Sequence, residues 1–167
     1  GSLDRKNQCA RLLCLRGAYP EGAIPRKDLA SLQVFMAEKH EICDLSGLEH
    51  ATNLDWLFLG RNQINDLTPL GKLTNLSRLF LFNNQISDVA PLVGLTRLER
   101  LYLPFNRISD ITPLTKLPFL AKLFLFDNPI PADKQALSEK ILPSCEIRVY
   151  PQDNSRTPPT RGRGRRP

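Results

Sequence analysis

Leucines recur along this chain with a period of 22 residues. Four segments, which begin at Leu54, Leu76, Leu98 and Leu120, share the pattern L-x-x-L-x-L-x-x-N. In each segment the alternation L-x-L predicts a short strand with its leucines on one face, because successive side chains of a strand point to opposite sides. A single turn of this kind cannot bury its leucines alone, and stacked turns bury a continuous core. The pattern therefore predicts an α/β repeat solenoid whose strands form one parallel sheet.

Two polar positions recur with the same period. An asparagine ends the leucine pattern of each repeat, at Asn62, Asn84, Asn106 and Asn128. Its amide can both donate and accept, so these side chains are predicted to form a buried ladder that satisfies backbone groups at a bend. Further along each of the first three repeats stands an aspartate, at Asp66, Asp88 and Asp110, followed by a proline at Pro69, Pro91 and Pro113. An aspartate here can cap a tight helical turn that begins with the proline. Capping is preferred to a metal site, because one capping carboxylate per turn needs no ion.

The repeats also resemble a known family. The motif I-x-D-[LIV]-x-P-L, present as ISDVAPL and ISDITPL, resembles the 22-residue leucine-rich repeat of the bacterial internalin type. Residues 24–54 are similar to the N-terminal end of such proteins, where a short helical cap leads into a degenerate repeat. The apolar places of that repeat are taken by Leu32, Phe35, Ala37 and Ile42, and His40 stands where asparagine is expected. The resemblance covers residues 24–130 and implies a short curved domain that binds a protein partner on its concave sheet.

Four parts of the chain are expected from these patterns. They are an N-terminal helical cap (3–31), the repeats (32–130, one degenerate and four clear), a C-terminal cap (131–150) and a tail (151–167). Caps are needed because an open end of the solenoid would expose its leucines to water. We expect an amphipathic helix at residues 3–16, and a helix after Pro131 that is followed by a last strand. Cys145 lies 22 residues after Leu123 and is expected to replace a core leucine.

The positive charge of the chain lies mostly in its tail. Residues 151–167 contain five arginines and one aspartate and so carry +4 of the net +6, which leaves +2 for residues 1–150. The tail is rich in proline, glycine and arginine without apolar periodicity, and we expect it to be mobile. A linker is the preferred interpretation over an arm for nucleic acid or an acidic partner. The leading Gly1 and Ser2 resemble an expression remnant, so the chain is expected to be a segment of a longer protein.

The cysteines and histidines predict neither a metal site nor a cofactor. Cys9, Cys14, Cys43 and Cys145 include no C-x-x-C pair, and His40 and His50 are the only histidines. Free thiols are preferred to a disulfide between the N-terminal cap and Cys43, a disulfide that would require secretion. His40 is expected to take the place of the bend asparagine and His50 to face solvent. The chain has no glycine-rich phosphate loop and no plausible nucleophile–histidine pairing, so it is predicted not to be an enzyme.

The strand positions between and beside the leucines point away from the core and gather aromatic and basic side chains. Eight of the twelve aromatic residues lie on or beside this face. Stacking between strands would explain some of them, yet a large exposed apolar patch flanked by cations is typical of an interaction surface. The candidate ligand-binding residues are Trp56, Phe58, Arg61, Arg78, Phe80, Phe82, Arg100, Tyr102, Phe105, Lys122, Phe124 and Phe126.

This face predicts a recognition module without catalytic activity that binds a protein or peptide, with the arginines and lysine meeting acidic groups of the partner. Two alternatives remain open at the level of sequence. The same face could bind single-stranded nucleic acid or a glycan by stacking, or the chain could be the targeting domain of a larger bacterial effector or enzyme. The resemblance implies a secreted or cell-surface location in a bacterium, with a cytoplasmic or host-delivered protein as the alternative. Oligomeric state is left open, and no apolar run is long enough to span a membrane.

Overall fold

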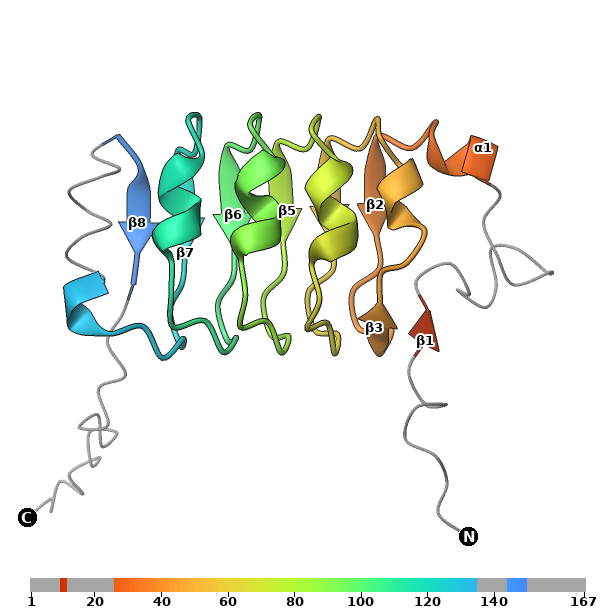
Figure 1. Cartoon of the computed structure of the whole chain (residues 1–167). Coiled ribbons are helices and arrows are strands. Elements are labelled where there is room, and N and C mark those ends of the chain that lie inside the picture. Colours follow the sequence, from red (N-terminus) through yellow and green to blue (C-terminus); the bar gives the residue numbers. More distant parts are fainter. Residues whose placement is uncertain (1–9, 12–25, 135–143, 150–167) are drawn as a thin grey trace, which may run out of the picture.

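The computed structural model describes residues 10–11, 26–134 and 144–149. Its main element is a six-stranded parallel sheet in the order β2-β4-β5-β6-β7-β8. The strands are β2 (Val34–Met36), β4 (Trp56–Phe58), β5 (Arg78–Phe80), β6 (Arg100–Tyr102), β7 (Lys122–Phe124) and β8 (Glu146–Arg148). A second, two-stranded sheet pairs β1 (Ala10–Arg11) with β3 (Ile42–Asp44). Figure 1 shows the six strands side by side, with helical turns stacked along one side of the sheet.

Those helical turns return the chain from one strand to the next. They are the 3-10 helices η3 (Leu48–His50), η4 (Thr68–Lys72), η5 (Ala90–Gly94) and η6 (Thr112–Lys116), and the short helix α1 (Arg26–Leu29) precedes the first repeat. A proline lies in the first turn of η4, η5 and η6, as predicted. The aspartates act slightly differently from the prediction. Asp66 and Asp88 accept a hydrogen bond from the N–H two residues later, which is the first residue of the helix, at 2.8 Å. They thus stabilise the approach to each helix by a local turn, while the residue at the N-cap is apolar.

The hydrophobic core lies between the sheet and the 3-10 helices. The strand leucines Leu57, Leu79, Leu101 and Leu123 are fully buried, together with the helix leucines Leu70, Leu92 and Leu114. Burial of each leucine contributes roughly 1.5–3 kcal/mol relative to exposure. Neighbouring strands pair in the predicted register, with Leu79 opposite Leu101, so the leucine columns run through successive turns. The solenoid of leucine-rich turns is confirmed.

The asparagine ladder is also confirmed. Asn62, Asn84, Asn106 and Asn128 are at most 8% exposed. Asn106 is typical: its Oδ1 accepts from the N–H of Ile86 at 3.1 Å, and its Nδ2 donates to the carbonyls of Leu81 and Leu103 at 2.9 Å. One amide therefore connects two successive turns at the bend after the strand. Among the described residues no buried side-chain nitrogen or oxygen lacks a partner.

The degenerate first repeat is present, but His40 does not join the ladder. Phe35 pairs with Leu57, and Ala37 and Ile42 are fully buried, as predicted. The side chain of His40 is exposed, whereas its backbone N–H donates to Asn62 Oδ1 at 3.0 Å. The prediction for His40 was wrong because the amide of the following repeat already satisfies this bend. His50 is half-buried, and its Nε2 lies 3.8 Å from Glu49.

The N-terminal end differs from the prediction where the structure describes it. Residues 10–11 form a strand, β1, which runs parallel to β3, where we expected a helix. Ala10 lies opposite Ile42 and Arg11 opposite Asp44, so β1 pairs with the backbone of the first repeat. Cys43 on β3 is disulfide-bonded, with its partner outside the described residues, so the preference for a free thiol at this position was wrong. The rest of the predicted helix at 3–16 lies outside the described residues.

The C-terminal end keeps its predicted strand in a shifted register. In β8, Ile147 lies opposite Leu123, which makes the last turn two residues longer than the others. A shift of two residues keeps the same face of a strand toward the core. Cys145 therefore still packs against the core, but it does not take the place that Leu123 predicted. Its burial raises the pKa of the thiol to about 11. Residues 132–134 are helical as predicted after Pro131, and residues 135–143 lie outside the described part.

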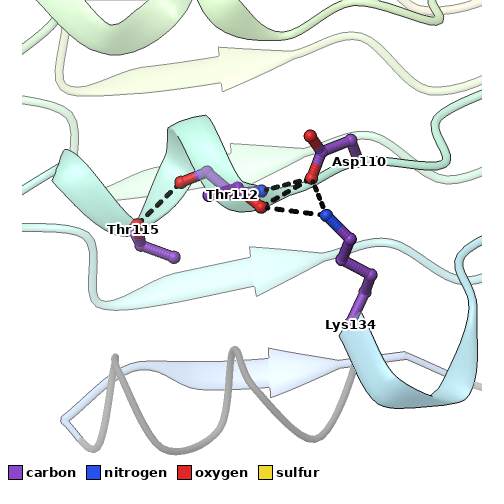
Figure 2. A network of polar contacts seen from close by, with 4 residues as sticks. All are labelled: Asp110, Thr112, Thr115 and Lys134. Carbon is purple, nitrogen blue, oxygen red and sulfur yellow. Dashed lines mark hydrogen bonds and ion pairs between the residues drawn. The ribbon is translucent and has the colours of Figure 1, made fainter.

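A polar network attaches the segment after the last repeat to the helix side of the solenoid (Figure 2). Asp110 Oδ1 accepts from the hydroxyl of Thr112 at 2.6 Å, from its N–H at 3.0 Å and from Lys134 Nζ at 3.0 Å. Hydrogen bonds from Thr112, and then from Lys134, lower the pKa of Asp110 to about 2. Thr115 donates to the carbonyl of Thr112 at 2.6 Å within the same helix. The turn that follows Ile130 is thereby fixed to η6.

Candidate partner-binding face

The side of the six-stranded sheet remote from the 3-10 helices is called the open face. Each strand places two side chains on it, because the leucine between them points into the core. On β5 these are Arg78 and Phe80, which flank the buried Leu79. Parallel pairing in constant register puts equivalent residues in columns that run across the sheet. The first column is Val34, Trp56, Arg78, Arg100, Lys122 and Glu146, and the second is Met36, Phe58, Phe80, Tyr102, Phe124 and Arg148.

The second column contains a continuous stack of aromatic rings. The ring centroids of Phe58 and Phe80 are 4.4 Å apart, those of Phe80 and Tyr102 also 4.4 Å, and those of Tyr102 and Phe124 4.6 Å. The planes of successive rings differ by 6°, 12° and 7°. The ring faces are therefore turned toward one another along the sheet, so it is the ring edges that meet solvent. Each pair contributes about 0.5–1.5 kcal/mol beyond the area that it buries.

A groove lies beside this stack on the open face. It measures about 390 Å³ and is lined by Phe80, Phe82, Tyr102, Pro104, Phe105, Phe124 and Phe126. The ring of Phe82 lies over Gly60, where an added Cβ would collide with it. Phe105 and Phe126 meet edge to face, with centroids 5.6 Å apart and planes at 89°. The lining is thus made only of aromatic residues and one proline, and its size falls in the range of small-molecule and side-chain binding pockets.

The bend after each strand contains a residue with a left-handed backbone, and at one bend this residue borders the groove. Lys39, Arg61, Asn83, Phe105 and Asp127 all have positive φ, between 54° and 62°. This left-handed conformation suits asparagine and aspartate, and it is uncommon for a bulky residue such as phenylalanine. Phe105 nevertheless adopts it and remains 52% exposed. A large apolar side chain is thereby held at the rim of the groove in a conformation that the bend requires.

The cations of the open face fall into two groups. Arg78 lies with its guanidinium carbon 4.2 Å from the Trp56 ring centroid, and that of Arg61 lies 6.0 Å from the centroid of Phe82. Lys122 and Arg148 instead contact Glu146, at 3.5 and 2.8 Å. The hydrogen bond from Arg148, with Lys122 nearby, lowers the pKa of Glu146. Within the described residues neither Arg78 nor Arg100 forms a salt bridge.

The structure brings all twelve predicted site residues onto or beside the open face, and it adds others. Sequence analysis missed Val34 and Met36, which are 44% and 67% exposed at one end of the columns. It also missed Glu146, because the last strand does not follow the period of 22. Val34 and Met36 could have been found by applying the column rule to the degenerate repeat. Pro104, which is buried against the groove, was also not named as a candidate.

A second hollow of about 380 Å³ lies at the edge where the strands begin. Its lining is polar and includes Asn53, Asp55, Asn75 and Arg97. These groups are largely engaged: Asn53 and Asn75 donate to backbone carbonyls of the preceding turn, and Arg97 donates to Asn75 Oδ1 at 3.0 Å. The described residues contain no group of three or more histidine, cysteine or acidic side chains that could hold a metal ion. They also contain no helix long and apolar enough to cross a membrane.

Comparison with known proteins agrees with this architecture. The family described as Leucine Rich repeats (2 copies) matches residues 52–94. A leucine-rich repeat protein of Leptospira interrogans superposes with a TM-score of 0.69 and 29% identity, over 75% of this chain and 33% of that protein. An internalin of Listeria monocytogenes superposes with a TM-score of 0.58 and 22% identity, over 76% of this chain and 45% of that one. No curated protein matches by sequence.

The chain spans about a third of the Leptospira protein and less than half of the internalin. Repeat solenoids of this kind generally serve as protein-interaction modules that use an extended sheet surface. The period of 22 residues, the asparagine ladder and these likenesses together show that the chain has the leucine-rich repeat fold.

Proposed function

We propose that the chain is a non-catalytic recognition module that binds a protein or peptide through its open face. The observation that carries this proposal is the groove of about 390 Å³ whose lining is wholly aromatic and proline, with cations nearby. Apolar surface of this kind gains about 25 cal/mol for each Å² removed from water, before the costs of association. Aromatic residues and arginine are also the types that dominate the energetics of protein interfaces.

Sheet stability alone does not require this arrangement. The stacked column from Phe58 to Phe124 accounts for four rings, and their mutual contacts would stabilise the sheet with or without a partner. Phe82, Phe105 and Phe126 lie outside that column and border the groove. Phe105 does so from a left-handed bend at 52% exposure, where asparagine would suit the backbone better. A ligand that uses the rim explains a phenylalanine there.

The stacking geometry favours a protein ligand over a nucleic acid or a glycan. Bases and sugars bind aromatic residues by stacking on ring faces. In the column Phe58, Phe80, Tyr102 and Phe124 those faces already contact one another at 4.4–4.6 Å. The exposed ring edges and the groove suit the aliphatic and aromatic side chains of a protein. The low net charge of residues 1–150, +2, also gives little of the electrostatic attraction on which nucleic-acid binding depends.

A secreted or cell-surface location fits this function. Cys43 is disulfide-bonded, and disulfides persist chiefly in oxidising compartments outside the cytosol. A bacterial protein that presents a recognition face to partners outside the cell would keep such a bond. We include this location in the proposal, and a free-thiol assay on protein recovered from its native compartment tests it.

Selection of peptides from a random library displayed on phage tests the proposed function. The bait is the full chain, and the negative bait is Phe80→Ala/Tyr102→Ala, which removes the middle of the aromatic stack and part of the groove lining. Phe119→Ala is the matched control, because Phe119 is 67% exposed and outside the groove. Peptides should be enriched by the wild type and by the control variant and lost with the double variant. Circular dichroism and light scattering check that the double variant is folded and whether the wild type self-associates through this face.

Failure of the library to yield any peptide that distinguishes wild type from the folded double variant would contradict the proposed function. If the double variant does not fold, Phe82→Ala replaces it. The ring of Phe82 borders the groove but lies outside the stacked column, so its removal leaves the stack in place.

A further inference from the structure

We propose that the open face selects an acidic segment that carries one bulky apolar anchor. The anchor side chain enters the aromatic groove, and the carboxylates contact Arg78 and Arg100. This inference rests on the proposed function and adds to it the chemical class of the ligand. It assigns different roles to the cations that sequence analysis treated alike.

The first observation is the distribution of unpaired positive charge. Lys122 and Arg148 both contact Glu146, so each cation at that end of the sheet already has a carboxylate partner within the protein. Arg78 and Arg100 lie directly opposite each other on β5 and β6 and form no salt bridge within the described residues. Both residues are half-buried, and two like charges at paired strand positions gain from a shared anion. The carboxylate site is therefore at this pair and not along the whole column.

The second observation is that Arg78 is already held in place. Its guanidinium carbon lies 4.2 Å from the centroid of the Trp56 ring. A guanidinium that stacks on an aromatic ring keeps the N–H donors at its edge available for a carboxylate. Because the side chain is fixed before the ligand arrives, less conformational entropy is lost on binding. Trp56 thus acts as a positioning residue for Arg78.

The third observation is the distance between the arginine pair and the groove. Arg78 and Phe80 are two residues apart on β5, and Phe82 is two residues further, which corresponds to about 7 and 13 Å along an extended strand. The groove spans the interval between these two positions. An extended peptide covers the same distance in about two to four residues. The ligand should therefore carry an aspartate or glutamate two to four residues from its leucine, phenylalanine or tryptophan.

The charge of the chain itself argues against its own tail as the occupant. Residues 151–167 carry +4 and would be repelled by Arg78 and Arg100. A nucleic acid would supply phosphates for the arginines, but its bases would find the faces of the stacked rings occupied. An acidic protein segment satisfies both the arginine pair and the groove.

The test uses the peptides that the full chain selects from the phage library. Each is synthesised in three forms: as selected, with every acidic residue changed to its amide, and with the apolar anchor changed to alanine. Fluorescence anisotropy gives the Kd of each form for wild type, for Arg78→Glu/Arg100→Glu and for the control Arg97→Glu/Arg107→Glu. The control makes the same charge change at two exposed arginines outside the strand columns.

We expect the amide form and the alanine form to bind about tenfold or more weakly than the selected peptide. The Arg78/Arg100 variant should lose a similar factor with the selected peptide and little with the amide form, while the control keeps wild-type affinity. Added salt should weaken the selected peptide and not the amide form. Oligo-dT added as a competitor should leave the peptide bound.

Three results would overturn this inference. The first result is that binding needs the open face but is unchanged by the amide change and by the Arg78/Arg100 variant. The ligand is then recognised by apolar contacts alone, so the proposed function stands and the proposed acidic ligand fails. Displacement by oligo-dT at low concentration would indicate a nucleic-acid site at the arginine pair. If no selected peptide depends on the open face, the proposed function itself fails.

Discussion

Removal of one amide from the asparagine ladder is expected to cost a large part of the stability of the domain. Asn106 is 7% exposed, and its side chain makes a long hydrogen bond of 3.3 Å to the carbonyl of Pro104. It also makes three shorter hydrogen bonds, with the N–H of Ile86 and with the carbonyls of Leu81 and Leu103. In Asn106→Ala these three backbone groups lose the partner that connects two turns. An unsatisfied buried polar group costs about 1–3 kcal/mol, and water that enters the vacated space offsets part of this.

We therefore expect a loss of about 3–5 kcal/mol in the free energy of unfolding, against a total of roughly 5–15 kcal/mol for a domain. Urea titration followed by circular dichroism and by the fluorescence of Trp56, the only tryptophan in the chain, measures it. Asn65→Ala is the control, because Asn65 is exposed, and it should change stability by less than about 0.5 kcal/mol.

Asn106→Asp provides a second measurement with nearly the same side-chain shape. The carboxylate keeps an acceptor for the N–H of Ile86, but it turns a negative oxygen toward two carbonyls that need donors. This environment raises the pKa of the new carboxyl group in the folded protein. The folded state then binds more protons than the unfolded state, so stability should increase as the pH falls through the raised pKa. A loss below about 1 kcal/mol in the alanine variant, or stability of the aspartate variant that does not change with pH, would refute the role given to the ladder.

Three further changes test other parts of the structure. Phe105→Asn should leave the free energy of unfolding within about 1 kcal/mol of wild type, because asparagine relieves the strain of the left-handed conformation and this offsets the lost ring contact. The variant should still bind the selected peptides more weakly in anisotropy measurements. A large destabilisation would show that the phenylalanine is needed for folding. Gly60→Ala should displace the ring of Phe82, because the added Cβ would collide with it. The displacement should change the aromatic NMR shifts and reduce the affinity for the selected peptides. Unchanged shifts would contradict the close packing of Phe82 on Gly60. Lys134→Ala should raise the pKa of Asp110 from about 2, and only partly, since hydrogen bonds from Thr112 are the larger cause. Because folding lowers this pKa, the ionised Asp110 stabilises the folded state at pH values above the ordinary pKa of aspartate, and this stabilisation is lost as the pH falls toward 2. An NMR titration of the Asp110 carboxyl group measures the pKa in both proteins.

The repeat fold could be predicted from the sequence because each of its constraints is local and periodic. A leucine at a fixed place is buried in every turn for the same reason, as at Leu79 and Leu101. The asparagine at the bend satisfies backbone groups of its own turn and the preceding one, so its role follows from its register. The alternation of strand side chains likewise placed Phe80 and Tyr102 on the face away from the core.

The predictions failed where the period ends. The last turn is longer, and this placed Ile147, and not Cys145, opposite Leu123. The strand at Ala10–Arg11 pairs with a segment more than thirty residues away, and no local pattern announces it. His40 matched the asparagine position by count, yet the amide of Asn62 had already satisfied the bend.

The sequence by itself thus determined the solenoid, the core and the residues that the regular repeats place on the open face, because these depend on period and on strand alternation. Only the tertiary structure decided how those residues act together. The stacking of the rings leaves their edges exposed, Trp56 holds Arg78, and Glu146 contacts Lys122. These properties depend on distances between side chains of different turns, and such distances are set only when the turns pack against one another.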